Sequence, residues 1–400
     1  MRIPDTKRFL VEWYFKRTRP YPTVFLLGPP GIGKSQVIED AARAISRQLG
    51  KEFVKFEKRC RVSVDGGTPR VEWVLNGNHT LIDVLTSPEK CFVLVDLRLV
   101  ECEPSDLSGF PDKVSGGYAV YDPPEWVPVL SVCDGILLLD ELTNVQRPDV
   151  ITAAYKLTRD RMAGFAKFGD GVLVVAAGND PEHSTVAVML PTPLVDRIRI
   201  LKSEAPTVDE WVSFMDACYK DKWDKLTYAF LKAFESEHYL LRVPREMETL
   251  SNFPTPRSWS ELALSMADGF TGSEMVGCHI GVEVGQRFSA FLSTRLPPIE
   301  EIIGDPKLFK KFAKEDNGVD KQFMTVFLLA TWMDANVTRL REALKLVDTM
   351  MDTSREIVVL LARMVREGTL LALLKEIEAT GRTSHMDFLF KITVGMDRQL

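Results

Sequence analysis

Gly28-Pro29-Pro30-Gly31-Ile32-Gly33-Lys34-Ser35 is the stretch that decides the fold of this chain. An apolar run, 23 to 27, precedes it, and a helical pattern, 36 to 48, follows it. Such a strand aims the loop, the glycines let backbone N–H groups face inward, and the helix N-terminus adds partial positive charge. The octet therefore predicts a phosphate-binding loop. The alternative is a tight strand-to-helix turn with a chance lysine, and the matching strand and helix count against it.

The side chains of the loop indicate which phosphate compound it binds. Lys34 would reach the β- and γ-phosphates of a nucleotide, and the Ser35 hydroxyl would ligate Mg²⁺. The cofactors predicted on this basis are ATP and Mg²⁺. The predicted nucleotide-binding residues of the loop are Gly28, Pro29, Pro30, Gly31, Ile32, Gly33, Lys34, Ser35 and Gln36.

Composition bounds the class of protein. The chain has 400 residues, of which 45% are hydrophobic, so it can bury a sizeable core in two or three domains. A formal net charge of -6 gives no overall attraction for nucleic acid, although a local basic groove is compatible with an acidic total. Nucleic-acid binding is therefore unsupported by charge but not excluded.

Cysteines and apolar runs bear on the compartment. The 6 cysteines are scattered without a C-x-x-C pair, which favours reduced thiols. Residues 1 to 22 contain no apolar signal core, and the longest apolar-rich run, 323 to 333, is shorter than the roughly 20 residues that span a bilayer. We expect a cytoplasmic protein without membrane association.

The first half of the chain has the pattern of a parallel α/β sheet. Apolar runs typical of strands buried on both faces lie at 92 to 97, 136 to 141 and 172 to 179. Helical patterns at about 126 to 132 and 146 to 158 lie between them. Three further elements are predicted: a helix at 5 to 17, a hairpin turn at 65 to 69 and a fifth strand at 197 to 201.

The second half changes to successive helices from Thr207 onward. Helices are predicted at 207–218, 222–236, 257–269, 273–292, 320–334, 338–350, 354–366 and 385–396. The charge-rich tract 305 to 322 is interpreted as a solvated face or loop. Because Pro297-Pro298 interrupts the helical pattern, we place a boundary there. The predicted domains are a nucleotide-binding core at 1–204, a helical lid at 205–295 and a helical extension at 296–400.

Asp140 and Glu141 end the second of the apolar strands. A carboxylate at the C-terminal end of a parallel strand faces the phosphate loop of the same sheet, so Asp140 is the predicted metal residue. The next side chain points elsewhere, and Glu141 is the predicted base that polarises water. Two carboxylates that merely end a strand are the alternative, and it weakens once the phosphate loop lies about a hundred residues upstream.

Asn179 ends the third apolar strand. A neutral amide at this place can orient the attacking water or contact the γ-phosphate without competing for Mg²⁺. We therefore include Asn179 among the predicted catalytic residues. The alternative is an Asn-Asp-Pro turn that simply ends the strand.

The order of phosphate loop, Asp-Glu strand, Asn-ended strand and helical region resembles that of an AAA+ ATPase. Segments that resemble the MoxR-type branch, with its phage and archaeal relatives, are 103–109, 190–197 and 254–259. The resemblance is strongest over about residues 20 to 200. It implies a P-loop AAA+ core with a parallel sheet, an all-α lid and a helical extension. It also implies a ring, usually a hexamer, with ATP bound between neighbouring subunits.

Two arginines are assigned through this resemblance. Arg197 corresponds to the arginine finger that reaches the γ-phosphate of the neighbouring subunit, and Arg199 is the neighbour that could substitute for it. Arg257 resembles the sensor-2 arginine of the lid: Thr255 would cap the helix and Pro256 would take its first position. A salt-bridged surface arginine is the alternative in each case.

The branch also carries two inserted hairpins. Here 112 to 121, with a Gly-Gly turn, matches the first, and 161 to 169 fits the second. In a ring both would face the pore, where Tyr118, Lys113 or Phe165 could grip a polypeptide or a nucleic-acid strand. The alternative is that these aromatic side chains pack the hairpins down.

Three classes of function follow from these residues. The first is a MoxR-like ring ATPase that remodels a protein client, often with a partner carrying a von Willebrand factor A domain. The second is a nucleic-acid motor of the translocation, restriction or packaging type. The third is a nucleotide-gated scaffold with little turnover, and the joint presence of Glu141, Asn179 and Arg197 counts against it.

Overall fold

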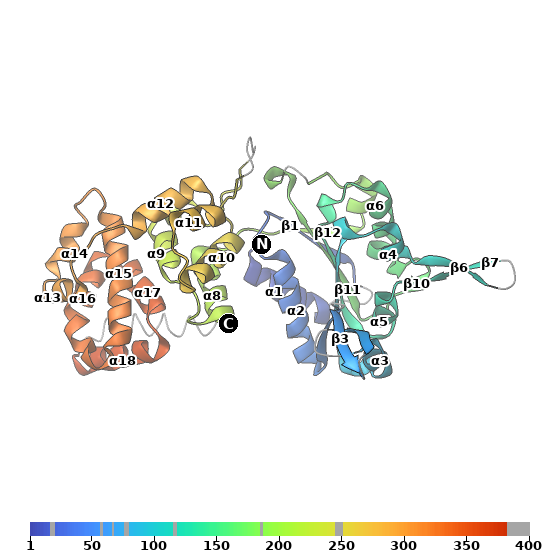
Figure 1. Cartoon of the computed structure of the whole chain (residues 1–400), viewed down its shortest axis with the longest axis horizontal. Coiled ribbons are helices and arrows are strands. Elements are labelled where there is room, and N and C mark those ends of the chain that lie inside the picture. The colour runs from blue at the N-terminus through green and yellow to red at the C-terminus, as the bar shows by residue number, and fades with distance from the viewer. Residues whose placement is uncertain are drawn as a thin grey trace. The chain divides into compact units, whose positions relative to one another are not determined.

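The computed structural model describes residues 1–16, 21–56, 59–65, 68–75, 80–114, 118–184, 187–244 and 251–381. The chain divides into two compact units, Met1–Ala205 and Pro206–Leu400 (Figure 1). The first contains a parallel sheet covered by helices, and the described part of the second is helical. The predicted fold class, an α/β core with a parallel sheet followed by an all-α region, is confirmed. The helix predicted at 385–396 lies outside the described residues.

The core sheet of the first unit has six strands. They are β1 (Thr23–Gly28), β2 (Glu52–Phe56), β5 (Cys91–Arg98), β8 (Asp134–Asp140), β11 (Val172–Asn179) and β12 (Ile198–Lys202). Their order across the sheet is β12-β1-β11-β8-β5-β2, and every neighbouring pair is parallel. β11 therefore lies between β1, which leads into the glycine-rich loop, and β8, which ends at Asp140. The carboxyl ends of these three strands share one edge.

Alternation within each strand explains why the sheet is buried on both faces. On β8, Ile136 and Leu138 belong to one hydrophobic cluster, whereas Leu137 and Leu139 belong to another. Successive side chains of a strand point to opposite faces, so the two clusters are the two faces of the sheet. Helices α1 (Ile3–Lys16) and α2 (Lys34–Leu49) cover the first face, and α5 (Trp126–Val132) and α6 (Pro148–Tyr155) cover the second.

Three antiparallel hairpins accompany the sheet. They are β3–β4 (Arg59–Asp65 and Thr68–Val74), β6–β7 (Phe110–Val114 and Tyr118–Asp122) and β9–β10 (Met162–Ala163 and Ala166–Lys167). Asp65 pairs with Thr68, as a hairpin at 65–69 requires, and residues 66 and 67 of the predicted turn lie outside the described residues. In Figure 1 the β6–β7 hairpin projects from the body of the first unit. The described residues of this unit also form three short α-helices: α3 (Leu81–Thr86), α4 (Pro104–Ser108) and α7 (Thr192–Val195).

Two element boundaries in the first unit differ from the prediction. The helix predicted at 146–158 is α6 followed by a π-helical turn, Lys156–Asp160, which ends at Arg161 in a left-handed conformation with φ 55°. Such turns within helices are rare and have no signature in the apolar spacing. The fifth strand begins at Ile198, so Arg197 precedes it.

The described part of the second unit is a set of helices around one core. They are α8 (Val208–Tyr219), α9 (Leu226–Ala233), α10 (Pro256–Ala267), α11 (Ser273–Ile280), α12 (Val282–Leu292), α13 (Ile299–Gly304), α14 (Lys307–Phe312), α15 (Gly318–Ala335), α16 (Leu340–Thr353), α17 (Arg355–Met364) and α18 (Glu367–Ala379). A single hydrophobic cluster extends from Val208 to Ile377. The boundary predicted near residue 295 falls within the range of this cluster, and the division into lid and extension stays a prediction.

The second unit differs from the prediction at one helix and contains helices that were not predicted. The helix predicted at 273–292 is two helices, because Gly281 has φ 80° and a Cβ there would lie 2.4 Å from the Asn252 carbonyl oxygen. Most charged side chains of the tract 305–322 are exposed, as expected for a solvated face, whereas Phe309 and Phe312 of α14 are buried. Helix α18 was not predicted. No helix among the described residues is both long and apolar enough to cross a bilayer.

Candidate active site

The glycine-rich loop joins β1 to α2 at the carboxyl edge of the sheet. Gly31 and Gly33 have φ of 72° and 96°, a region that side chains disfavour. A Cβ on Gly28 would lie 2.4 Å from the Ser203 carbonyl oxygen. An α-helix leaves its first N–H groups without intrahelical partners, and Gly33, the N-cap of α2, has no side chain to accept from them. The loop thus presents backbone donors and a helix N-terminus, as an anion site requires.

Lys34 is folded back into this loop. Its side chain is buried, with 8% exposure, and Nζ donates to the carbonyl oxygens of Gly28 at 3.0 Å and Pro29 at 2.7 Å. Nζ also donates to Oδ1 of Asn179 at 3.0 Å. The ammonium group therefore links the loop after β1 with the end of β11. It lies where a phosphate held by the loop would meet it.

Ser35 in the first turn of α2 and Asp140 at the end of β8 form a second hydrogen-bonded pair. The Ser35 hydroxyl donates to Oδ2 of Asp140 at 2.6 Å, and Oδ1 of Asp140 accepts from the Glu141 backbone N–H at 2.9 Å. A hydroxyl and a carboxylate are oxygen ligands of the kind that Mg²⁺ takes, usually with one or two carboxylates and the phosphates of a substrate. This donor pair fits Mg²⁺. Among the described residues there is no group of three or more His, Cys, Asp or Glu that could hold a metal by itself.

Glu141 follows β8 in an unusual backbone conformation. Its φ of 59° and ψ of 31° place it in the left-handed region, which costs a residue other than glycine on the order of 1 kcal/mol. The chain then makes a 3₁₀ turn, Leu142–Asn144. Non-glycine residues held in this region concentrate at functional sites. The roles predicted for Asp140 and Glu141 stay predictions.

Asn179 is fixed at the end of β11 by a residue that the sequence did not single out. Thr143 exchanges two hydrogen bonds with the Asn179 backbone: its hydroxyl donates to the Asn179 carbonyl oxygen at 3.0 Å and accepts from the Asn179 N–H at 2.8 Å. No motif or spacing indicates Thr143. Thr143 lies in the 3₁₀ turn Leu142–Asn144, and apolar periodicity does not predict which residues of such a turn are buried.

The structure therefore brings together Lys34, Ser35, Asp140 and Asn179. Arg197 lies elsewhere in this unit, with its guanidinium 5.2 Å from the centre of the Tyr155 ring. Arg199 is exposed on β12 and donates to the carbonyl oxygens of Asp196 and Ile198. The finger role of Arg197 stays a prediction.

Arg257 belongs to the second unit and is exposed in the first turn of α10. The predicted cap is confirmed, because the Thr255 hydroxyl accepts from the Ser258 N–H at 3.1 Å. Pro256 takes the first helical position, as predicted. The role of Arg257 at the nucleotide stays a prediction.

The two hairpins predicted to grip a client share an aromatic contact. Phe165 lies between β9 and β10 and is 72% exposed, and its ring centre is 5.3 Å from that of Tyr121 on β7. The Lys156 ammonium is 5.2 Å from the Phe165 ring centre. Phe110 and Val120 are also exposed. The side chains of Lys113 and Tyr118 lie outside the described residues.

Comparison with known proteins identifies no family for this chain. No protein-family model matches the chain, and no curated protein matches it. Among solved structures, the S. cerevisiae Hsp104-ADP complex matches with a TM-score of 0.32 and 13% sequence identity, over 99% of this chain and 47% of that chain. The chain thus spans less than half the length of that protein. The function must be argued from the geometry of the site.

Proposed function

We propose that the chain is an ATP hydrolase, a P-loop ATPase of the MoxR-type AAA+ branch, that works as a ring and remodels a protein client. One observation carries the proposal. Lys34 and Asn179 meet at 3.0 Å, and Ser35 and Asp140 meet at 2.6 Å. Lys34 and Ser35 begin the helix that follows β1, and Asp140 and Asn179 end the parallel strands β8 and β11. Ligands in open α/β sheets bind at this edge.

In the proposed mechanism the loop from Gly28 to Gly33 holds the phosphates, and Lys34 neutralises their charge. Ser35 and Asp140 would hold Mg²⁺, which would supply charge neutralisation for the transferred phosphoryl group. Asn179 orients the attacking water, and Glu141 accepts its proton. Arg197 is proposed to complete the site of the neighbouring subunit.

Exposed apolar side chains on the two hairpins support a protein client. Phe165, Tyr121, Phe110 and Val120 are exposed, and the Lys156 ammonium lies 5.2 Å from the Phe165 ring centre. The β6–β7 hairpin, which carries three of these residues, projects from the body of the first unit (Figure 1). Exposed apolar groups rimmed by polar ones are typical of interaction sites. A partner carrying a von Willebrand factor A domain is part of the proposal through the family resemblance alone.

Whether Arg197 acts on the site of the neighbouring subunit is tested by mixing two variants. Arg197→Ala should lower turnover by about 10³-fold, the lower end of the effect of an arginine finger. Lys34→Ala should abolish nucleotide binding in its own site. If the finger acts in trans, mixed rings of the two inactive variants contain some intact sites and should recover ATPase activity.

Mixed assembly is confirmed by co-purification of differently tagged subunits. No recovery at any ratio, despite confirmed mixed assembly, would contradict action in trans. Arg199→Ala is the matched control, because Arg199 lies two residues away and donates to local carbonyl groups. It should retain most of the activity.

A nucleic-acid motor is the alternative function. It predicts that DNA or RNA raises the ATPase rate and that the complex weakens steeply with salt. The net charge of -6 does not favour it. ATPase assays with single-stranded and double-stranded DNA and with RNA distinguish the two functions, since a protein-remodelling ATPase is stimulated by none of them.

A further inference from the structure

Thr143 connects three segments of the candidate active site. Its hydroxyl makes the two hydrogen bonds to the Asn179 backbone described above, at 3.0 and 2.8 Å. Its own carbonyl oxygen accepts from the Val188 N–H at 2.8 Å. It lies two residues after Glu141, in the 3₁₀ turn where the Asn144 N–H bonds to the Glu141 carbonyl oxygen at 2.9 Å. With 2% exposure, this hydroxyl is shielded from water.

The neighbouring strand leaves space for this hydroxyl. A Cβ on Gly178 would lie 2.6 Å from Oγ1 of Thr143 and 3.0 Å from the Phe25 ring. Both distances are shorter than ordinary van der Waals contact, so a side chain at position 178 would displace the Thr143 hydroxyl or the ring. Gly178 and Thr143 are therefore sterically matched, because the absent side chain of Gly178 leaves room for the Thr143 hydroxyl.

We propose that Thr143 is a positioning residue for ATP hydrolysis. It holds the Asn179 backbone in register with the turn that carries Glu141, so that the amide and the carboxylate act on the same water. This inference rests on the proposed function and adds a residue to it. Because Oδ1 of Asn179 accepts from Lys34, a shift of the Asn179 backbone is also a shift of an acceptor of the lysine.

The chemistry explains why a hydroxyl is needed at this place. Asn179 has one backbone donor and one backbone acceptor to satisfy there, and a single hydroxyl can both accept and donate. Valine has the same shape without these bonds, and it would leave buried polar groups of Asn179 unpaired. A misplacement of about 1 Å in a catalytic group can cost on the order of a hundredfold in rate.

The test compares Thr143→Val with Thr143→Ser in the full-length protein. For Thr143→Val we expect kcat to fall about tenfold or more, with KM for ATP within about twofold, because the phosphate loop is intact. Thr143→Ser keeps the hydroxyl and should recover most of kcat. Gly178→Ala should lower kcat like Thr143→Val, although the hydroxyl is still present.

Thr6→Val is the matched control, because Thr6 is also fully buried in the first unit and its hydroxyl donates locally, to the carbonyl oxygen of Arg2 at 3.0 Å. It should leave kcat unchanged. A loss of kcat in Thr6→Val equal to that in Thr143→Val would overturn the proposal, since the effect would then be one of general stability. Wild-type kcat in Thr143→Val would overturn it as well.

A second measurement needs no nucleotide. Hydrogen exchange at Asn179, followed by mass spectrometry with residue-level fragmentation, should be at least about tenfold faster in Thr143→Val than in the wild type or in Thr143→Ser, because the amide loses its acceptor. Unchanged exchange would contradict the positioning role. If the wild type neither binds nor hydrolyses ATP, the proposed function fails, whereas the exchange result still decides whether Thr143 fixes Asn179.

Discussion

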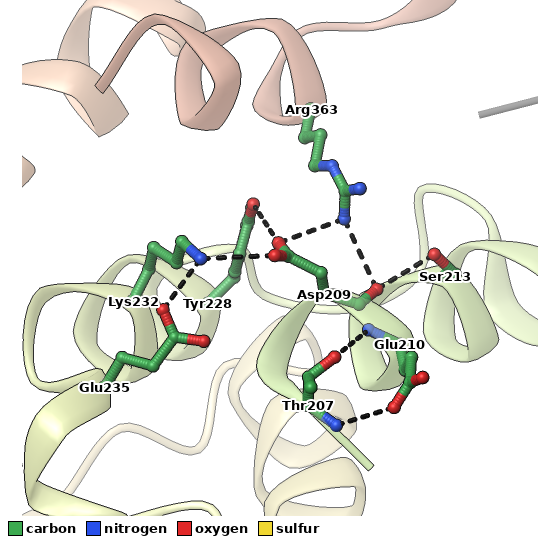
Figure 2. Close-up of polar contacts among 8 residues, drawn as sticks. All are labelled: Thr207, Asp209, Glu210, Ser213, Tyr228, Lys232, Glu235 and Arg363. Atoms are coloured by element: carbon green, nitrogen blue, oxygen red, sulfur yellow. Dashed lines mark hydrogen bonds and ion pairs between the residues drawn. The ribbon is translucent and has the colours of Figure 1, made fainter. Parts of the chain in front are cut away.

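Two polar clusters of this protein differ in the partners of their charged side chains. In the second unit, the Asp209 carboxylate accepts from Lys232 and from Arg363, each at 3.2 Å, and from the Tyr228 hydroxyl at 3.4 Å (Figure 2). Lys232 also donates to Glu235 at 2.8 Å. This Asp209 cluster thus pairs two carboxylates with two cations supplied by the chain itself.

The candidate active site in the first unit is built differently. Lys34 donates to two carbonyl oxygens and an amide oxygen, and Asp140 accepts from a hydroxyl and a backbone N–H. These are the groups that phosphates and a divalent cation would engage. In the Asp209 cluster the ionic partners are matched within the chain, as stability requires, whereas at Lys34 and Asp140 neutral partners hold the charged groups in place and leave them able to bind charged ligands.

Glu141→Gln should give the largest effect and should separate function from stability. If Glu141 accepts the proton of the attacking water, turnover should fall about 10²- to 10⁴-fold, while ATP binding and the unfolding temperature stay close to those of the wild type. Steady-state ATPase assays, binding of a fluorescent ATP analogue and thermal unfolding measure the three quantities. Turnover at the wild-type rate would show that Glu141 is not the base.

Asp209→Ala should give the opposite pattern. It leaves Lys232 and Arg363, each with 15% side-chain exposure, without their shared carboxylate. Breaking a buried pair costs about 3 to 5 kcal/mol, but Asp209 is 37% exposed, so we expect a loss of about 1 to 3 kcal/mol in the free energy of unfolding. Denaturant-induced unfolding of the second unit measures this change in free energy.

Glu342→Ala is the control for this loss. It removes an exposed pair with Arg339 in the same unit, whose side chains are 49% and 52% exposed. The expected cost is below about 1 kcal/mol. Equal losses in Asp209→Ala and Glu342→Ala would show that the Asp209 cluster contributes no more than a surface pair.

A buried titratable group outside both clusters affects stability only at high pH. Burial raises the pKa of the Cys133 thiol from 9.0 to about 12. The folded state therefore keeps a proton that the unfolded state loses above about pH 9, so this thiol lowers stability as the pH rises from 9 towards 12. The unfolding temperature should fall less steeply over that range in Cys133→Ala than in the wild type. Parallel pH profiles of the two proteins would contradict this assignment.

The sequence predicted the parts of the fold that depend on local patterns. The strands ending at Asp140 and Asn179 are continuous apolar runs, and the loop at Gly28 to Ser35 has fixed spacing, so the sequence predicted these strands and the loop. The break at Gly281 was not, since a glycine inside a helical pattern is often tolerated. Thr143 was missed because Asn179, with which its hydroxyl forms hydrogen bonds, lies 36 residues away in the sequence. Pairing at that distance depends on the order of strands, which local patterns do not contain.

The single hydrophobic cluster of the second unit has a mechanical consequence. It packs α8 and α17 into the same core, and Arg363 of α17 bonds both to the Asp209 carboxylate and to its carbonyl oxygen, 154 residues away in the sequence. A close-packed interior has low compressibility and transmits strain. A displacement of α8 would therefore be transmitted through this core to α17, although the two helices lie far apart in the sequence.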